Sequence, residues 1–136
     1  MAYIVGLVLA LAAGVFATVV GLDRDRGFYP TVMIVIGCLY SLFAVMGGSN
    51  KALVLEVLAG AVFVAAAVAG LRTSLWIVVI ALAGHGVFDF VHPRLIDDPG
   101  VPVFWPQFCS AYDIAAAAYL AGLLKLGRIE PSPVGV

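Results

Sequence analysis

Long apolar runs follow one another along almost the whole chain and leave little room for any other kind of structure. A run of roughly 17–25 apolar residues forms a helix long enough to cross a hydrocarbon core of about 30 Å. Lipid offers the backbone no hydrogen-bond partners, so a helix is required, and the sequence lacks the alternation of a barrel strand. We therefore predict an all-α integral membrane bundle of five transmembrane helices in a single domain, residues 1–136. The predicted spans are residues 2–22, 30–48, 52–71, 73–91 and 107–126.

The composition excludes several classes of protein. Hydrophobic residues make up 64% of the chain and charged residues 11%, whereas soluble domains have about 45–50% and about 25%. Such a chain has too few polar side chains for a water-facing surface, which excludes a soluble enzyme and a disordered segment. The 7 Lys and Arg residues against 8 Asp and Glu residues exclude a basic nucleic-acid-binding protein. We expect the first run to be retained as a span, because it is longer than the roughly 7–15 apolar residues of a secretory signal.

The distribution of basic residues predicts an orientation in the membrane. Lys and Arg in short loops favour the cytoplasmic side. With five spans, one side collects five basic residues and the other side collects two. This asymmetry predicts an external amino terminus, a cytoplasmic carboxyl terminus and an external loop at residues 92–106. The larger group is Arg24, Arg26, Arg72, Lys125 and Arg128, and the smaller group is Lys51 and Arg94.

Three acidic residues lie inside the predicted spans, where a charge costs at least about 2.5–3.5 kcal/mol. They are Glu56, Asp89 and Asp113, and no Lys or Arg lies mid-span to pair with them. Both histidines of the chain, His85 and His92, flank Asp89 at spacings of four and three residues, which places the three side chains on one helix face. Under the predicted topology all of these groups lie in the outer half of the membrane. We therefore expect one polar pocket between the third, fourth and fifth spans.

Such a pocket suits a metal ion, since carboxylates and imidazoles on facing helices bind zinc, iron or manganese. His85 and His92 are about 10.5 Å apart along a helix axis, so one ion is not expected to take both. The other histidine would act as a base, as a partner of a ligand or as a ligand of a second ion. The candidate metal ligands are His85, Asp89, His92 and Asp113, the candidate catalytic residues are Glu56 and Asp89, and Cys109 is a further candidate ligand.

Two interpretations without a metal stay open for the same residues. An imidazole exchanges protons with carboxylates near neutral pH, so the group can form a proton relay or a polar ligand pocket. Buried His and Asp side chains can also hydrogen-bond to one another and do no more than fix the packing of the helices.

Small residues at every fourth position of the first span predict close helix packing. Gly6, Ala10 and Gly14 form one ridge, and a second ridge follows on the neighbouring face. These ridges predict either packing inside the bundle or the interface of a homo-oligomer. The second ridge consists of Ala13, Ala17 and Gly21.

The loop at residues 92–106 contains four prolines, which make it stiff and non-helical. Pro106 suits the first turn of the next helix, and Phe104 and Trp105 suit the level of the lipid headgroups. The loop is therefore either a lid that admits a lipid-like molecule to the pocket or a rigid connector anchored at the membrane interface.

Residues 85–113 read HGVFDFVHPRLIDDPGVPVFWPQFCSAYD and cover about a fifth of the chain. This segment resembles a group of short bacterial multi-span membrane proteins of unknown function. The resemblance implies a small multi-span fold with a His/Asp pocket, located in the bacterial cytoplasmic membrane.

Together these features favour a metal-binding membrane protein, either a hydrolase or an oxidoreductase that acts on a lipid-like substrate. The ion would activate a water or an oxygen species, with Glu56 as the general base. The alternative is a non-enzymatic membrane component, such as a proton-coupled carrier or an assembly subunit of a larger complex. The expected partners are membrane lipids, a lipid-like substrate and further copies of the chain.

Overall fold

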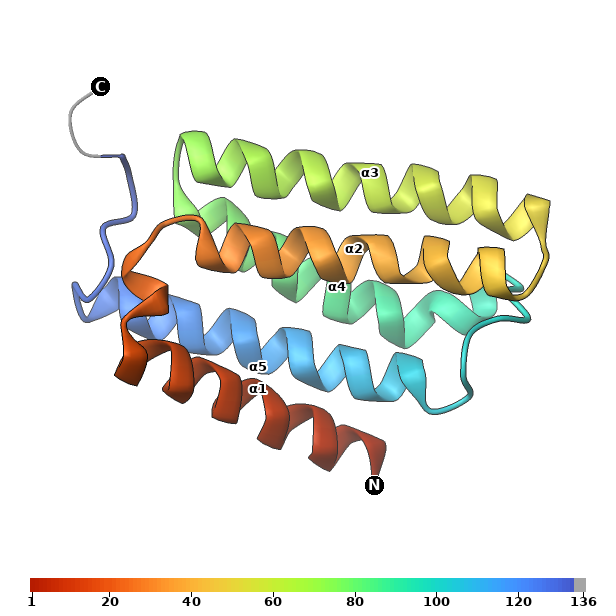
Figure 1. Cartoon of the computed structure of the whole chain (residues 1–136), viewed down its shortest axis with the longest axis horizontal. Helices are drawn as coiled ribbons and strands as arrows, with labels where there is room; N and C mark the ends of the chain where they lie inside the picture. Colours follow the sequence, from red (N-terminus) through yellow and green to blue (C-terminus); the bar gives the residue numbers. More distant parts are fainter. Residues whose placement is uncertain (134–136) are drawn as a thin grey trace.

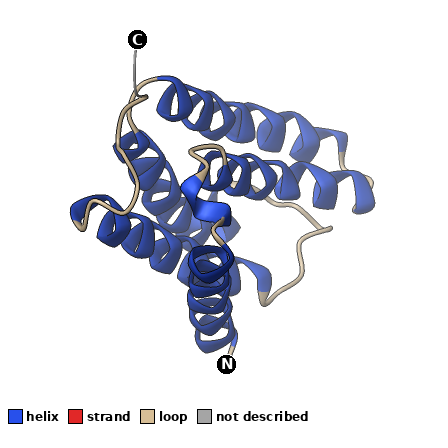
Figure 2. Cartoon of the chain, turned by 60° about the vertical axis from the view of Figure 1, so that its left-hand side comes forward, coloured by secondary structure: helices blue, strands red, loops and turns tan. Residues whose placement is uncertain are grey.

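Five long helices and one short 3-10 turn make up the computed structural model, which describes residues 1–133. These residues contain no strand, so the all-helical prediction is confirmed, and loops lie only at the ends of the helices (Figure 2). Each helix begins and ends within a few residues of a predicted apolar run. The elements are α1 (Ala2–Val20), η1 (Leu22–Arg24), α2 (Phe28–Met46), α3 (Asn50–Arg72), α4 (Leu75–Leu95) and α5 (Trp105–Lys125) (Figure 1).

The order in which the helices pack is α1, α5, α4, α3 and α2. α5 packs along both α1 and α4, and α3 packs along both α4 and α2. In the described part of the chain, α1 and α2 share no extended interface. The bundle core lies between α2, α4 and α5, around Met33, Leu82 and Leu120. The helices therefore form an open arc with α1 and α2 at its two ends.

The first small-residue ridge of α1 packs inside the chain. Gly6, Ala10 and Gly14 are buried, and a Cβ atom on Gly6 would lie 2.2 Å from the carbonyl oxygen of Phe108 on α5. Only a residue without a side chain allows so close an approach of two helix backbones. The second ridge is interrupted, because Gly21 has a φ of 84° and ends α1.

Four of the described helices, α1 to α4, are long and apolar enough to cross a membrane. Large apolar side chains on their outward faces are exposed, among them Phe16, Val62 and Ile80. Apolar surface on this scale is typical of contact with lipid rather than with water. α5 has 21 residues and is long enough as well. It is the least apolar of the five helices, and it also has more buried residues than any of the others.

The larger group of basic residues lies at the end of the bundle where α1, α3 and α5 stop (Figure 1). The Arg26 guanidinium there donates hydrogen bonds to the carbonyl oxygens of Glu130 and Leu71, at 2.6 and 3.1 Å. The Leu75 N–H donates to the carbonyl of Pro131 at 2.8 Å. These bonds satisfy backbone groups that helix ends leave free, and they hold three connections together.

α4 is longer than predicted and contains part of the expected loop. We expected the helix to stop at residue 91 because proline lacks the N–H that continues a helix. The structure instead carries α4 through Pro93 to Leu95, and the Ile96 N–H donates to the carbonyl of His92 at 3.0 Å. Pro93 removes only one helical hydrogen bond, the one to the carbonyl of Asp89, and the next turn still closes. The helix therefore continues past Pro93, and the predicted end at residue 91 was wrong.

The remaining loop, residues 96–104, packs closely on the end of α2. A Cβ atom on Gly100 would lie 1.8 Å from the carbonyl oxygen of Phe43. The ring of Trp105 stands edge-on to the ring of Phe43, with 4.9 Å between the ring centroids. These contacts hold the loop against the end of α2.

Candidate metal centre

Four side chains with metal-binding atoms meet at the contact between α4 and α5. His85 and Asp89 come from α4, and Cys109 and Asp113 come from α5, each pair four residues apart. This spacing stacks both members of a pair on one helix face. All four residues are buried, and one donor atom from each lies within 4.8 Å of the donor atoms of the other three.

A small residue and a hydrogen bond bring the two helices together at this level. A Cβ atom on Gly86 would lie 3.0 Å from the carbonyl oxygen of Ser110. The Ser110 hydroxyl donates a 2.7 Å hydrogen bond to the carbonyl of Gly86. The sequence therefore positions the ligands through a Gly beside His85 and a Ser beside Cys109.

The distances between donor atoms are close to those of a four-coordinate site. Bonds of about 2.0–2.1 Å from a zinc ion to nitrogen and oxygen, at a tetrahedral angle, place the two ligand atoms about 3.3 Å apart. His85 Nδ1 lies 3.3 Å from Asp89 Oδ2 and 2.7 Å from Asp113 Oδ2. Cys109 Sγ lies 4.0 Å from Asp113 Oδ2. Since the four donor atoms all lie within 4.8 Å of one another, an ion at the centre requires shifts of up to about an ångström.

The two carboxylates of the group are buried with several oxygens unpaired. Asp89 and Asp113 are both 0% exposed. Within residues 1–133, neither oxygen of Asp89 and only one oxygen of Asp113 has a hydrogen-bond partner. A buried carboxylate without partners is costly, so such groups usually pair with a cation. The unpaired oxygens therefore fit a bound metal ion.

Glu56 and His92 form a separate pair instead of completing this group. His92 Nε2 lies 2.6 Å from Glu56 Oε1, and both side chains are buried. Since α3 packs on α4, Glu56 faces the last turns of that helix. The single pocket that we expected is thus divided into a four-residue group and a His–Glu pair, with Asp89 between the two histidines along α4.

Tyr40 on α2 connects the two groups and was not predicted from the sequence. Its ring stacks on His92 with 4.0 Å between centroids and lies 6.1 Å from the ring of His85. Its buried hydroxyl approaches Asp89 without meeting hydrogen-bond geometry. The only signal in the sequence was a tyrosine in the middle of an apolar run, which fits many packing roles.

A small cavity reaches the centre from the end of the bundle that carries the amino terminus. Its volume is about 200 Å³, and Asp89 is its most deeply buried lining residue. Arg94 and Gln107 supply polar groups, and Tyr3 covers it from α1. An ion needs such a route to enter a preformed site. The cavity therefore lies next to the centre, and a small movement of the residues around Asp89 would open a route for an ion beside the connector between α4 and α5.

No protein-family model matches the sequence, and no curated protein or solved structure is detectably similar to it.

Proposed function

We propose that this chain is an integral membrane protein that binds one divalent transition metal ion at His85, Asp89, Cys109 and Asp113. The observation that carries the proposal is the meeting of four buried donors from two helices, two of them carboxylates with unpaired oxygens. His92, a candidate ligand by sequence, takes the role of a partner to Glu56. The segment at residues 85–113 resembles bacterial membrane proteins, which supports the bacterial cytoplasmic membrane as the location.

The donor set favours zinc or iron over manganese. A thiolate is a soft ligand that zinc and iron accept, whereas manganese prefers carboxylates, carbonyls and water. One nitrogen, one sulfur and two carboxylate donors can complete a tetrahedral site. If one carboxylate instead leaves a position to water, the ion can activate that water as a nucleophile.

α5 is proposed as the fifth span, with the amino terminus external. Ser110 and Asp113, the polar residues well inside α5, are buried in the bundle rather than exposed to lipid, so its modest hydropathy does not oppose insertion. Asp113 then lies about 12 Å from the start of α5, in the outer half of the membrane. One end of the bundle carries more basic residues than the other. Because Lys and Arg favour the cytoplasmic side, this difference supports placing the more basic end in the cytoplasm.

The chemistry that we propose is hydrolysis or oxidation of a lipid-like molecule. An ion held by the four residues would supply Lewis-acid or redox chemistry, and the pair of Glu56 and His92 would accept a proton. Asp89 would act both as a ligand and as the link to that pair, because it lies one turn from each histidine.

One observation favours a non-enzymatic alternative. His85 Nδ1 and Asp113 Oδ2 are at hydrogen-bond distance, 2.7 Å, as are His92 Nε2 and Glu56 Oε1 at 2.6 Å. Two His–carboxylate pairs joined by a stacked tyrosine can carry protons through a transporter, or can fix the packing of a subunit in a larger complex.

Elemental analysis of the detergent-purified protein separates these functions. The proposal predicts near-stoichiometric zinc or iron in the native protein and its loss in Asp113→Asn. Cys38→Ala is the matched control, because Cys38 is a free cysteine outside the group. If no transition metal is present near stoichiometry, even after metal supplementation, the metal-binding function is refuted and the carrier or subunit function is favoured.

A further inference from the structure

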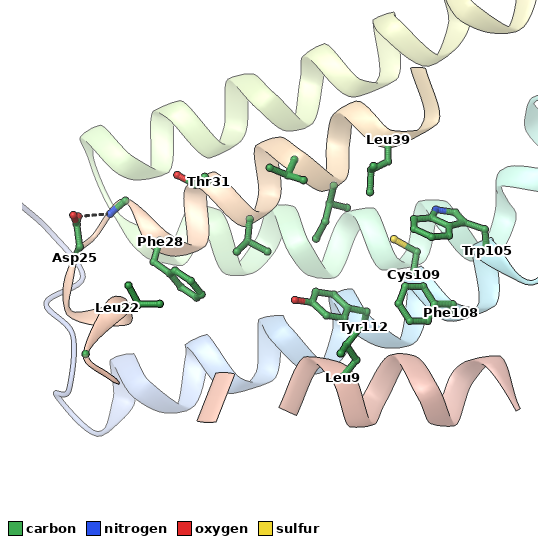
Figure 3. A pocket seen from close by; sticks show the side chains of 15 residues that line it. Leu9, Leu22, Asp25, Phe28, Thr31, Leu39, Trp105, Phe108, Cys109 and Tyr112 are labelled. Carbon is green, nitrogen blue, oxygen red and sulfur yellow. Dashed lines mark hydrogen bonds between the residues drawn. The ribbon is translucent and has the colours of Figure 1, made fainter. Parts of the chain in front are cut away.

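An apolar groove runs between the two ends of the helical arc. It lies between α1 and α2, which share no extended interface, and α5 forms its floor. Its volume of about 750 Å³ is within the range of small-molecule sites, about 300–1,000 Å³. Figure 3 shows Leu9 on α1, Leu39 on α2 and Tyr112 on α5 around this space.

The groove opens sideways, toward the surface that would contact lipid. Leu9, Leu22 and Val35 line it and are also among the exposed apolar side chains of the bundle. A molecule dissolved in the bilayer can therefore enter without crossing the headgroup layer. From Phe28 to Leu39 the groove follows α2 for about 17 Å, close to the thickness of one leaflet at about 15 Å.

The two ends of the groove differ in polarity and in what lies behind them. At one end, Asp25 already accepts a 2.8 Å hydrogen bond from the N–H of Gly27. At the other end, Trp105, Phe108 and Cys109 gather (Figure 3). The indole N–H of Trp105 is a buried donor without a partner in the described residues. An acceptor oxygen on a bound molecule would satisfy it.

Cys109 belongs both to the lining of the groove and to the four-residue metal group. The groove therefore ends beside the candidate metal centre. A molecule that lies in the groove would bring its end near Trp105 to within one side chain of the ion. This continuity distinguishes the groove from other apolar surface of the bundle.

We propose that the groove binds the hydrocarbon chain of a single-chain, lipid-like molecule, with its oxygen-bearing end at Trp105 and Cys109. The role of the groove as a substrate site rests on the proposed metal function. The binding of a hydrocarbon chain in the groove does not depend on that function. We favour this occupant over a partner helix because the groove ends at Trp105 and Cys109, beside the four-residue group.

Photolabelling with two fatty acids tests the site and the direction of the chain. One probe carries a diazirine next to its carboxylate, and the other carries it near its methyl end. We expect saturable labelling by both, with the first probe on peptides at Trp105 to Cys109 and the second on peptides at Leu22 to Val32. Unlabelled oleic acid should compete with both probes.

Matched variants make the test independent of general lipid contact. Val35→Trp fills the groove and should reduce labelling about tenfold. Val62→Trp places the same residue on the lipid-facing surface of α3 and should leave labelling unchanged. Labelling spread over all exposed helices, or equal in the two variants, overturns the proposal, as does a reversed pattern of the two probes.

Metal content measured on the same preparations separates the two proposals. Val35→Trp should keep the metal, because Val35 is outside the four-residue group. If the metal is retained but the groove is not labelled, the chain-binding proposal is refuted and the metal proposal stands. Groove labelling without metal confirms chain binding and refutes the metal function.

Discussion

At the scale of single residues, Asp89 is the group on which the site depends. It is fully buried, lies 3.3 Å from Nδ1 of His85 and has no hydrogen-bond partner for either oxygen among residues 1–133. His85 and His92 lie one turn away on either side of it. A buried carboxylate without partners is costly, and the four-donor group to which it belongs favours the role of a metal ligand.

Asp89→Asn separates a ligand from a packing residue. The amide keeps the volume, and neither oxygen of Asp89 has a hydrogen-bond partner to lose among residues 1–133, so the free energy of unfolding should change by only about 1 kcal/mol. Metal content should fall strongly, because the charge that holds the ion is removed. Thermal unfolding and elemental analysis of the same sample measure both. Full metal retention in the folded variant would show that Asp89 only packs.

His92→Ala tests the division of the site into two groups. We expect the metal to stay bound, while stability falls by about 1–3 kcal/mol because the buried Glu56 loses its partner. Combining it with Glu56→Ala should recover part of that loss, since no buried carboxyl is then left unpaired. His85→Ala is the comparison and should lose the metal. Equal metal loss in His85→Ala and His92→Ala would contradict the division.

At the scale of helices, the sequence predicted more of the fold than of the site. Apolar runs that stop at polar or glycine-rich connections defined all five helices, because length and hydropathy are properties of one helix. The shared face of residues 85, 89 and 92 was predictable as well, because it follows from their spacing within one helix. The pairing of His92 with Glu56 and the position of Tyr40 depend on how α2, α3 and α4 rotate against one another. That rotation is set by packing, which no single-helix pattern contains.

Gly6→Ala tests the close contact between α1 and α5. The new Cβ would lie 2.2 Å from the carbonyl oxygen of Phe108, so α1 must move away from the floor of the groove. Overpacking of this kind costs about 1–3 kcal/mol. Gly122→Ala is the control, because nothing lies within 4 Å of its Cβ position and alanine favours a helix. Denaturant titration in detergent should show a loss for the first variant and none for the second.

At the scale of the whole molecule, two openings of different chemistry end beside one centre. The small cavity at Arg94 and Gln107 leads to Asp89 from the end of the bundle. The apolar groove leads to Cys109 from the side. An ion or water and an apolar molecule could therefore approach the same four residues by separate routes. This arrangement follows from the open arc of helices, since a closed bundle would bury the groove.

The orientation of the whole molecule is tested by reporter fusions at both ends. The basic group around Arg24, Arg26 and Arg72 should be cytoplasmic, which makes the carboxyl terminus cytoplasmic and the amino terminus external. A fusion at the carboxyl terminus should be active only with a cytoplasmic reporter. Activity of an external reporter there would reverse the topology and move the metal centre to the cytoplasmic half of the membrane.

X-ray absorption spectroscopy of the purified protein tests whether His85, Asp89, Cys109 and Asp113 hold a metal ion. For zinc, we expect one sulfur at about 2.3 Å together with nitrogen and oxygen at about 2.0–2.2 Å, and four ligands in all. Cys109→Ser should remove the sulfur signal and keep the others. A shell of oxygens alone in the native protein, or a sulfur signal unchanged in Cys109→Ser, would refute this assignment of the ligands.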